Sequence, residues 1–410
     1  MRIERLGDLG GFPALLRAVA AATTRLGLAP PAALSGDWFG SSAVIAPTVR
    51  AEPTAPTDVF AVAAAQHPSA VGGGWIGYLS YPEDAGTPSR LPESAGGWTD
   101  CVLRRDLDGC WWFEDLTGAP MPGWLADALR TPAAPAPWRI SWTAPDRAAH
   151  EAGVLACLEA ISAGEVYQAC VCTQFTGILD GAPLDFFADA VRRTSPARAA
   201  FVAGEWGAVA SLSPELFLRR RADAVWSSPI KGTLPLHADP ALLRESVKDV
   251  AENVMIVDLV RNDLGRVATT GSVRVPELLT IQPAPGVWHL VSTVTAQVPG
   301  EVSNQMLLDA TFPPASVTGT PKQRARELLS QWEPHRRGVY CGTVGLASPI
   351  AGTELNVAIR TVEFDAGGNA VLGVGGGITA DSDPAAEWNE CLHKASPTLH
   401  LTADEVTPAT

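Results

Sequence analysis

The chain has 410 residues, of which 46% are hydrophobic and 18% are charged. Thirty lysines and arginines stand against 44 aspartates and glutamates, which gives a formal net charge of −14. This composition excludes an intrinsically disordered chain, and the acidic excess argues against nucleic acid as a partner. No apolar run approaches the roughly 18 residues that a membrane-spanning helix needs, and early acidic residues argue against a signal peptide. We therefore expect a soluble, cytoplasmic protein with no membrane partner.

Seven cysteines are spread along the chain, and none belongs to a CxxC pair. This spacing predicts neither a disulfide framework nor a zinc ribbon. One Glu-x-x-His pair occurs, Glu390 to His393, whereas a di-iron bundle needs two such pairs. Cys170 and Cys172 alternate in a strand-like run and are expected to be buried thiols, and we expect no soft-metal chemistry.

The N-terminal third is rich in glycine, tryptophan and proline and contains short strand-like runs. Residues 96–116 contain an Asp-Gly turn, which predicts a hairpin. Residues 72–77 satisfy the G-x-G-x-x-G pattern of dinucleotide-binding proteins, but proline and turn residues follow where that motif needs a helix. A tight glycine turn is the better interpretation. Four prolines in 131–147 then indicate a linker.

After the linker, Asp146 is a candidate N-cap for a helix over about 147–162. Strand-like runs follow, and apolar periodicity predicts helices over about 241–263, 320–331 and 384–396. The last third contains strand-like runs at 339–348, 355–364 and 370–376. Long strands of antiparallel type mixed with a few long helices predict an α+β fold.

Two of the predicted helices each carry two acids one turn apart. Asp249 and Glu252 share one helix face, and Glu387 and Glu390 repeat that spacing, with Lys394 four residues later. Four carboxylates on two facing helices would repel one another unless a cation lay between them, and oxygen-only ligands favour Mg²⁺ over zinc. The alternative for either helix alone is a solvated face.

Three other segments carry candidate chemistry. Lys231 lies between a proline-terminated strand and a Gly-Thr turn, and an ordinary surface lysine is the alternative. Glu215 enters an apolar strand after a proline, where partial desolvation would raise its pKa and suit a general acid. Arg360 stands in an apolar strand-like run and needs a carboxylate, which a ligand could supply. A glycine loop at 375–377 would bring backbone amides close to an anion.

In this order, the motifs resemble the chorismate-utilising enzymes, which include anthranilate, aminodeoxychorismate, isochorismate and salicylate synthases. The resemblance covers about 148–400, and the N-terminal third fits only loosely. It implies two large antiparallel sheets with helices outside, an N-terminal region at 1–147 packed on a catalytic region at 148–402, and a tail at 403–410. The motifs that carry it are SPELF, PIKGT, KDVAENVMIVDLVRNDLGRVA, VPELLTIQPAPGVWHLVST, SVTGTPKQRA, YCGTVG and GGGITADSDPAAEWNECLHKA.

The resemblance also implies roles for individual residues. Mg²⁺ would be bound by Glu252 and Glu390, with Asp249 and Glu387 reached through water, and would hold the ring carboxylate of chorismate. Glu215 would protonate the departing carbon-4 hydroxyl, and His289 would line the pocket beside the ring. The remaining substrate-binding set that the resemblance implies is Gly232, Thr233, Tyr340, Arg360, Gly375, Gly376, Gly377 and Lys394.

Two positions separate members of this family. Water-using members have a lysine base where this chain has Gln168, and a neutral amide cannot act as that base. Anthranilate synthases typically have P-I-A-G-T, whereas aminodeoxychorismate synthases have P-I-K-G-T, as here with Lys231. The resemblance therefore favours amination of chorismate at carbon 4, toward 4-aminobenzoate and folate. The alternatives are anthranilate synthase component I and a non-catalytic chorismate-binding subunit.

The chain contains no glutaminase signature. Ammonia would therefore come from a separate glutaminase subunit or from free ammonium. No aminotransferase-like lyase is attached either, so aromatisation of the product would need another enzyme.

Overall fold

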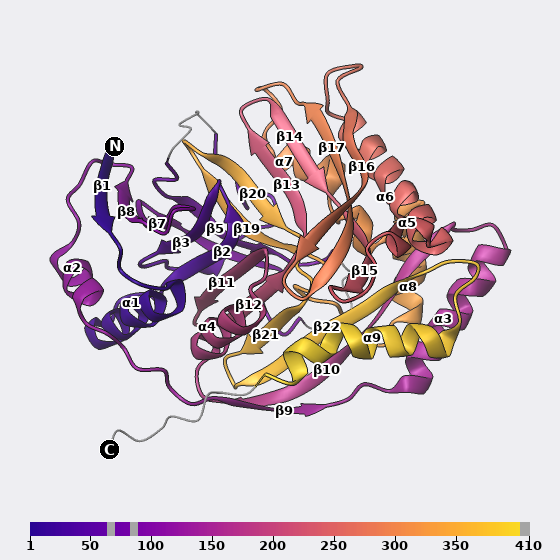
Figure 1. Cartoon of the computed structure of the whole chain (residues 1–410), viewed down its shortest axis with the longest axis horizontal. Helices are drawn as coiled ribbons and strands as arrows, with labels where there is room; N and C mark the ends of the chain where they lie inside the picture. Colours follow the sequence, from indigo (N-terminus) through magenta and orange to yellow (C-terminus); the bar gives the residue numbers. More distant parts are fainter. Residues whose placement is uncertain (64–69, 83–88, 402–410) are drawn as a thin grey trace.

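The computed structural model describes residues 1–63, 70–82 and 89–401. Two large antiparallel sheets form the body, and helices pack on their outer faces (Figure 1). This architecture confirms the predicted α+β class and two-sheet arrangement. The predicted tail at 403–410 lies outside the described residues. No helix in the described part of the chain is long and apolar enough to cross a membrane.

The first sheet has twelve strands in the order β1-β8-β7-β3-β2-β11-β12-β21-β22-β10-β18, with β9 also paired to β10. Its strands are β1 (Arg2–Gly7), β2 (Ala32–Trp38), β3 (Ser41–Ala46), β7 (Cys101–Arg105), β8 (Trp111–Asp115), β9 (Arg139–Thr143), β10 (Gln168–Asp180), β11 (Arg198–Gly204), β12 (Gly207–Ser213), β18 (Gly319–Thr320), β21 (Thr361–Asp365) and β22 (Asn369–Ile378).

The second sheet has ten strands in the order β15-β17-β14-β13-β20-β19-β5-β6-β4, with β16 also paired to β17. Its strands are β4 (Glu52–Pro53), β5 (Gly74–Leu79), β6 (Ser94–Thr99), β13 (Leu216–Arg221), β14 (Ala224–Ser228), β15 (Ile230–Pro235), β16 (Arg274–Ala284), β17 (Val287–Gln297), β19 (Thr343–Ser348) and β20 (Gly352–Asn356).

Helices α6, α8 and α9 pack against strands that carry predicted site residues, whereas α1 lies at the other end of the molecule (Figure 1). The helices are α1 (Phe12–Leu26), α2 (Gly123–Arg130), α3 (Arg147–Ser162), α4 (Pro183–Thr194), α5 (Leu242–Glu245), α6 (Val247–Gly265), α7 (Asn304–Thr311), α8 (Lys322–Trp332) and α9 (Pro384–Leu399), with a short 3₁₀ helix at Ala315–Val317.

Strands from the N-terminal third belong to both sheets. β2 pairs with β11, and β5 pairs with β19, so residues before and after the linker share the same hydrogen-bonded ladders. The predicted hairpin with the Asp-Gly turn is present as β7 and β8. Gly74 begins β5, so a strand stands where a dinucleotide-binding motif needs a helix. The boundary at residue 147 stays a prediction.

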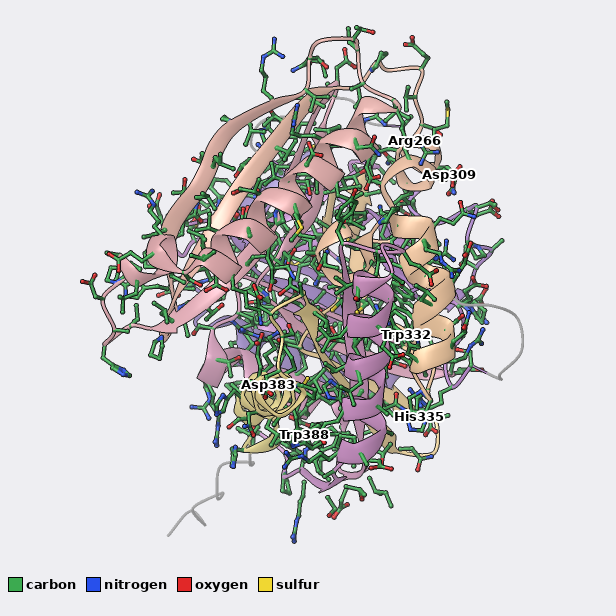
Figure 2. All side chains as sticks on the ribbon, turned by 90° about the vertical axis from the view of Figure 1, so that its right-hand side faces the viewer. Arg266, Asp309, Trp332, His335, Asp383 and Trp388 are labelled. Carbon is green, nitrogen blue, oxygen red and sulfur yellow. The ribbon has the colours of Figure 1, made fainter. Side chains whose placement is uncertain are left out.

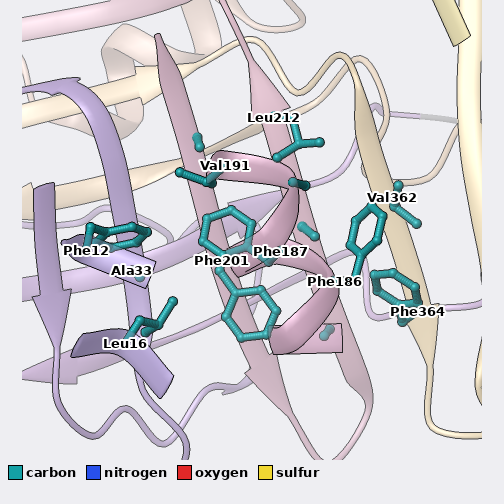
Figure 3. Packing of buried hydrophobic residues seen from close by; sticks show 14 of the residues in the cluster. Phe12, Leu16, Ala33, Phe186, Phe187, Val191, Phe201, Leu212, Val362 and Phe364 are labelled. Atoms are coloured by element: carbon teal, nitrogen blue, oxygen red, sulfur yellow. The ribbon is translucent and has the colours of Figure 1, made fainter. Parts of the chain in front are cut away.

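Aromatic side chains fill the core between α4 and the first sheet (Figure 3). Phe186 meets Phe364 of β21 edge to face, with ring centroids 5.5 Å apart, and Phe187 packs on Phe201 of β11 at 5.3 Å. Such pairs add about 0.5–1.5 kcal/mol beyond the area that they bury. This cluster fixes the N-terminal helices and strands to the strands that lead toward the site.

Local sequence explains where the helices near the site begin. The carboxylate of Asp146 accepts hydrogen bonds from the amides of Ala148 and Ala149, which confirms the predicted cap of α3. The single helix predicted over 241–263 was wrong, because Ser246 separates α5 from α6. The Ser246 hydroxyl accepts from the amide of Asp249 and so starts a new helix there.

The strand predicted over 355–364 is also interrupted. β20 ends at Asn356 in the second sheet, and β21 begins at Thr361 in the first. Arg360 stands in the connection between them, with a left-handed φ of 51°. The chain changes sheets at this point, which a continuous apolar pattern could not reveal.

Candidate active site

The predicted residues gather where the two sheets approach each other. β15 of the second sheet carries Lys231, β10 and β22 of the first sheet carry Gln168 and Gly377, and α6 carries Glu252. These elements and α9 occupy one half of the molecule, on the right in Figure 1. The candidate site is therefore assembled from segments that are up to about 200 residues apart in sequence.

Gly377 marks the point of convergence. A Cβ atom built on Gly377 would lie 3.1 Å from the Lys231 Nζ, 3.1 Å from the Glu252 Oε2 and 3.3 Å from the Gln168 Oε1. The Lys231 Nζ itself is 3.4 Å from the Glu252 Oε2. The Gln168 Oε1 is buried without a hydrogen-bond partner, although a buried polar atom normally has one. These groups surround a small polar space that a side chain at 377 would fill.

The predicted glycine loop was wrong. Gly375, Gly376 and Gly377 lie inside β22 and pair with Cys172, Val171 and Cys170 of β10. These glycines therefore contribute to the site by leaving room for the neighbouring side chains. A Cβ on Gly375 would lie 2.5 Å from the Cys172 Sγ, and one on Gly376 would lie 3.0 Å from the Glu387 Oε2.

The acids of α6 and α9 meet around a lysine. The Lys248 Nζ donates to the Glu387 Oε1 at 2.7 Å and lies 3.9 Å from the Glu252 Oε1. Burial raises the pKa of Glu390, but Lys394, Lys248 and Lys231 oppose it and leave that pKa below its ordinary value. Asp249 lies beside Gly232, where a Cβ would come within 3.1 Å of its side chain. The cluster therefore attracts positive charge.

This acid set fits the donor chemistry of Mg²⁺. Within the described residues, no three His, Cys, Asp or Glu side chains converge into a ready metal-binding group. Instead, the Lys248 ammonium lies between Glu252 and Glu387, and the Glu387 Oε2 is buried with no hydrogen-bond partner. Carboxylate oxygens without nitrogen or sulfur donors suit a hard cation.

Glu215 and Arg360 form the other side of the site. Burial raises the pKa of Glu215 to about 7, although a hydrogen bond from Ser316 and the charges of Lys231 and Arg360 oppose it. The Glu215 carboxyl is thus partly protonated near neutral pH, as a general acid requires. Arg360 forms no ion pair within 4.0 Å in the described part of the chain. Burial lowers its pKa, although the charge of Glu215 opposes that shift. A half-buried guanidinium of this kind is suited to an anionic ligand.

His289 is a neutral residue that has one free nitrogen. Its Nδ1 lies 2.9 Å from the Thr233 Oγ1, while its buried Nε2 has no partner. Burial, together with the charge of Arg360, lowers the pKa of His289 to about 4. The ring therefore stays uncharged at neutral pH and offers a nitrogen to a ligand.

Two predicted residues have partners of their own. The Lys394 Nζ pairs with the Glu390 Oε1 at 2.7 Å and donates to the carbonyl of Gly375 at 2.9 Å. The Tyr340 hydroxyl is 4.0 Å from the Cys172 Sγ, and its ring packs where a side chain on Gly373 would otherwise lie. The substrate contacts expected of Tyr340 and Lys394 stay predictions.

Sequence reasoning missed Lys248. It precedes Asp249 and stands four residues before Glu252, so the i, i+4 spacing of opposite charges could have indicated it. Its contact with Glu387, which is 139 residues away, could not have been read from the sequence.

Comparison with known proteins identifies the family. The model of the chorismate binding enzyme family matches residues 56–400. The chain belongs to that family. A curated relative, aminodeoxychorismate synthase component 1 of Klebsiella aerogenes, is 44% identical over 247 residues, which cover 58% of this chain and 54% of the relative. The chain thus spans about half the length of this curated relative.

Two further proteins extend the comparison. Anthranilate synthase component 1 of Streptomyces coelicolor is 34% identical over 366 residues, which cover 79% of this chain and 71% of that protein. The crystal structure of anthranilate synthase component I from Streptococcus pneumoniae matches with a TM-score of 0.71 and 26% identity, over 90% of this chain and 91% of that one. This chain and the Streptococcus pneumoniae enzyme therefore share the same fold.

Proposed function

We propose that this chain is the chorismate-aminating component of an aminodeoxychorismate synthase, which replaces the carbon-4 hydroxyl of chorismate with an amino group. The observation that carries this proposal is the placement of Lys231. Its ammonium nitrogen converges with Gln168 and Glu252 on the space above Gly377. The name of the Klebsiella aerogenes relative supports the same activity.

Lys231 is the proposed nucleophile, which acts in its neutral form. Its Nζ forms a bond to carbon 2, the two ring double bonds shift, and the carbon-4 oxygen leaves as water with a proton from Glu215. Ammonia then bonds to carbon 4, the double bonds shift back, and the bond between carbon 2 and Nζ breaks. The nitrogen is thereby directed to carbon 4. Gln168 cannot take a proton from water, which disfavours water as the nucleophile in place of Lys231.

Mg²⁺ is the proposed cofactor, held by Glu252 and Glu390 with Asp249 and Glu387 nearby. When bound, it would neutralise the ring carboxylate of chorismate and polarise that end of the ring. Arg360 is the proposed partner of the second carboxylate, because burial disfavours its charge and it forms no ion pair within 4.0 Å among the described residues. Thr233 and His289 would orient the ring from β15 and β17.

A separate glutaminase is the proposed source of ammonia, and the aminated product would serve 4-aminobenzoate and folate synthesis in the cytoplasm. The Klebsiella aerogenes relative is named a component 1, which supports a two-component enzyme. Free ammonium at high concentration would replace the glutaminase in an assay.

The test is to supply the purified chain with chorismate, Mg²⁺ and ammonium, and to add an aminodeoxychorismate lyase in a second step. We expect 4-aminobenzoate only when the lyase is added. Lys231→Ala should abolish its formation, and Arg139→Ala, on the exposed strand β9, serves as the control. Full carbon-4 amination by Lys231→Ala would refute the covalent mechanism.

The Streptomyces coelicolor relative supplies the alternative activity. Fluorescent anthranilate formed directly, without a lyase, would establish that alternative and refute ours. Chorismate binding without turnover of any nucleophile would instead indicate a non-catalytic subunit.

A further inference from the structure

A small cavity lies beside Glu215, and Lys231 is not among the described residues that line it. Its polar lining consists mainly of Glu215, Ser316, Asp263 and Thr311. The remaining lining residues are largely apolar. The cavity has room for about one water molecule. The hydroxyl of Ser316 also hydrogen bonds to the Glu215 carboxyl. A buried acid of the proposed site thus shares a water-sized space with a second buried acid.

Asp263 is part of a buried ion pair. Near the C-terminal end of α6, its Oδ2 accepts a hydrogen bond from the Lys322 Nζ at 2.5 Å, and the same Nζ donates to the carbonyl of Thr311 at 2.8 Å. Asp263 is only 5% exposed. Burial raises the pKa of Asp263 and lowers that of Lys322, although each partner's charge opposes the shift of the other. These opposite shifts lower the free-energy cost of moving a proton from Lys322 to Asp263.

The same pair reaches the surface on its other side. Asp263 and Lys322 line a groove of about 1120 Å³ between α6 and the start of α8. Arg266 and Asp309 also line this groove, and both are labelled in Figure 2. The positive charges that face the pair are those of Arg266 and Arg326. Asp263 therefore lines both the outer groove and the cavity of Glu215.

The proposed reaction removes one proton from Glu215 in each turnover, and that proton leaves in water. The nitrogen of ammonia becomes an ammonium group on carbon 4, which releases its surplus proton to solvent. Glu215 must take up one proton before the next turnover. A bound substrate covers the Lys231 side of the carboxyl, where the charge of Arg360 also opposes an incoming proton. The described residues that line the cavity include no lysine or arginine. A proton that approaches Glu215 from this side therefore meets no cation until it reaches Lys322 of the Asp263–Lys322 pair.

We propose that Lys322 and Asp263 form a proton relay that reprotonates Glu215 from the outer groove through a water molecule in the cavity. This inference rests on the proposed function, since it supplies the acid of that reaction. Lys322 gives a proton to Asp263, Asp263 gives one through the water to Glu215, and Lys322 regains a proton from water in the groove. Both residues act through Glu215 and do not touch the substrate.

Lys322→Arg is the decisive variant. Arginine preserves the positive charge and the ion pair with Asp263, but it does not release a proton at working pH. A purely structural ion pair predicts that Lys322→Arg behaves like the wild type. The relay predicts that its kcat falls roughly tenfold or more, as Asp263→Asn should, with the KM for chorismate nearly unchanged.

The second readout is rescue by small acids. Formate or imidazole buffers should restore part of the lost kcat of Lys322→Arg and Asp263→Asn in a concentration-dependent manner, and leave the wild-type rate unchanged. Wild-type kcat in Lys322→Arg, or a loss that no buffer relieves while circular dichroism shows a folded protein, would overturn the relay. If Asp263→Asn does not fold, the kcat values of Lys322→Arg and Ser316→Ala, with and without added buffer, decide whether the relay operates. Failure of the wild type to aminate chorismate would instead refute the proposed function.

Discussion

The ammonium group of Lys248 lies 2.7 Å from the Oε1 of Glu387 and thereby joins α6 to α9. The same oxygen accepts a hydrogen bond from Ser382 at 2.6 Å, while the Oε2 of Glu387 has no partner. A protein cation thus stands among the acids that we propose as ligands of Mg²⁺. Lysine and metal would therefore compete for the same carboxylates.

Lys248→Met should tighten the binding of Mg²⁺ in the absence of substrate. Removal of this partly exposed positive charge should make the binding free energy of Mg²⁺ more favourable by about 1 kcal/mol, which lowers the Kd roughly fivefold. Isothermal titration calorimetry measures the change. Arg261→Met is the control, because Arg261 lies on the same helix but pairs with Asp258. Equal or weaker binding by Lys248→Met would show that the ammonium does not compete with the metal.

Gly377→Ala should reduce chorismate amination by at least roughly tenfold. The added methyl group would lie 3.1 Å from both the Lys231 Nζ and the Glu252 Oε2, and so would displace both groups from the pocket. Gly265→Ala, at the end of α6, adds a methyl group that meets nothing within 4 Å and should keep full activity. Steady-state rates of the two variants, with melting curves, make the comparison. Equal activity would mean that the space above Gly377 is not used.

Glu215→Gln should stabilise the protein in a pH-dependent way. The folded-state pKa of Glu215 is about 7, above its ordinary value, so the folded protein binds more protons than the unfolded chain between about pH 4.5 and 7. The wild type therefore loses stability from this group as pH rises through that window, by up to about 3 kcal/mol. The advantage of the neutral glutamine should grow over the window and level off above it.

Urea unfolding at a series of pH values measures this difference. Glu159→Gln changes an exposed carboxyl on α3 and should show no comparable trend. A constant difference between wild type and Glu215→Gln across the window would contradict a raised pKa.

Arg360→Gln should raise the KM for chorismate about 10- to 100-fold without lowering the melting temperature. A charge-assisted hydrogen bond to the substrate would be lost, while the fold would lose no ion pair to a described carboxylate. Arg139→Gln, on the exposed strand β9, should leave both quantities unchanged. A large loss of stability in Arg360→Gln, with an unchanged KM, would assign Arg360 to the fold rather than to the substrate.

The sequence predicted those features that depend on local spacing. Asp146 caps α3 as expected, and the acids of α6 and α9 stand one turn apart on their helices. The hydrophobic pattern could not show that Ser246 restarts a helix. It also could not show that Arg360 stands where the chain passes from one sheet to the other, because buried runs of both sheets have the same composition.

The contacts across the site required the structure. Lys248 and Glu387 are 139 residues apart, and Asp263 and Lys322 are 59 residues apart. Both members of the second pair belong to motifs that resemble the family, but no role for them followed from the motifs alone. Only the fold shows that Asp263 lines both the groove and the cavity of Glu215.

The proposed site draws Lys231 from one sheet and Gln168 from the other. A ligand that touches both residues would tie the two sheets together, so its binding free energy would add to the free energy of unfolding of the whole chain. N-terminal strands such as β2 and β5 share these ladders and would gain protection from amide hydrogen exchange, although they carry none of the proposed catalytic residues. Occupancy of the pocket would thus be measurable far from the chemistry.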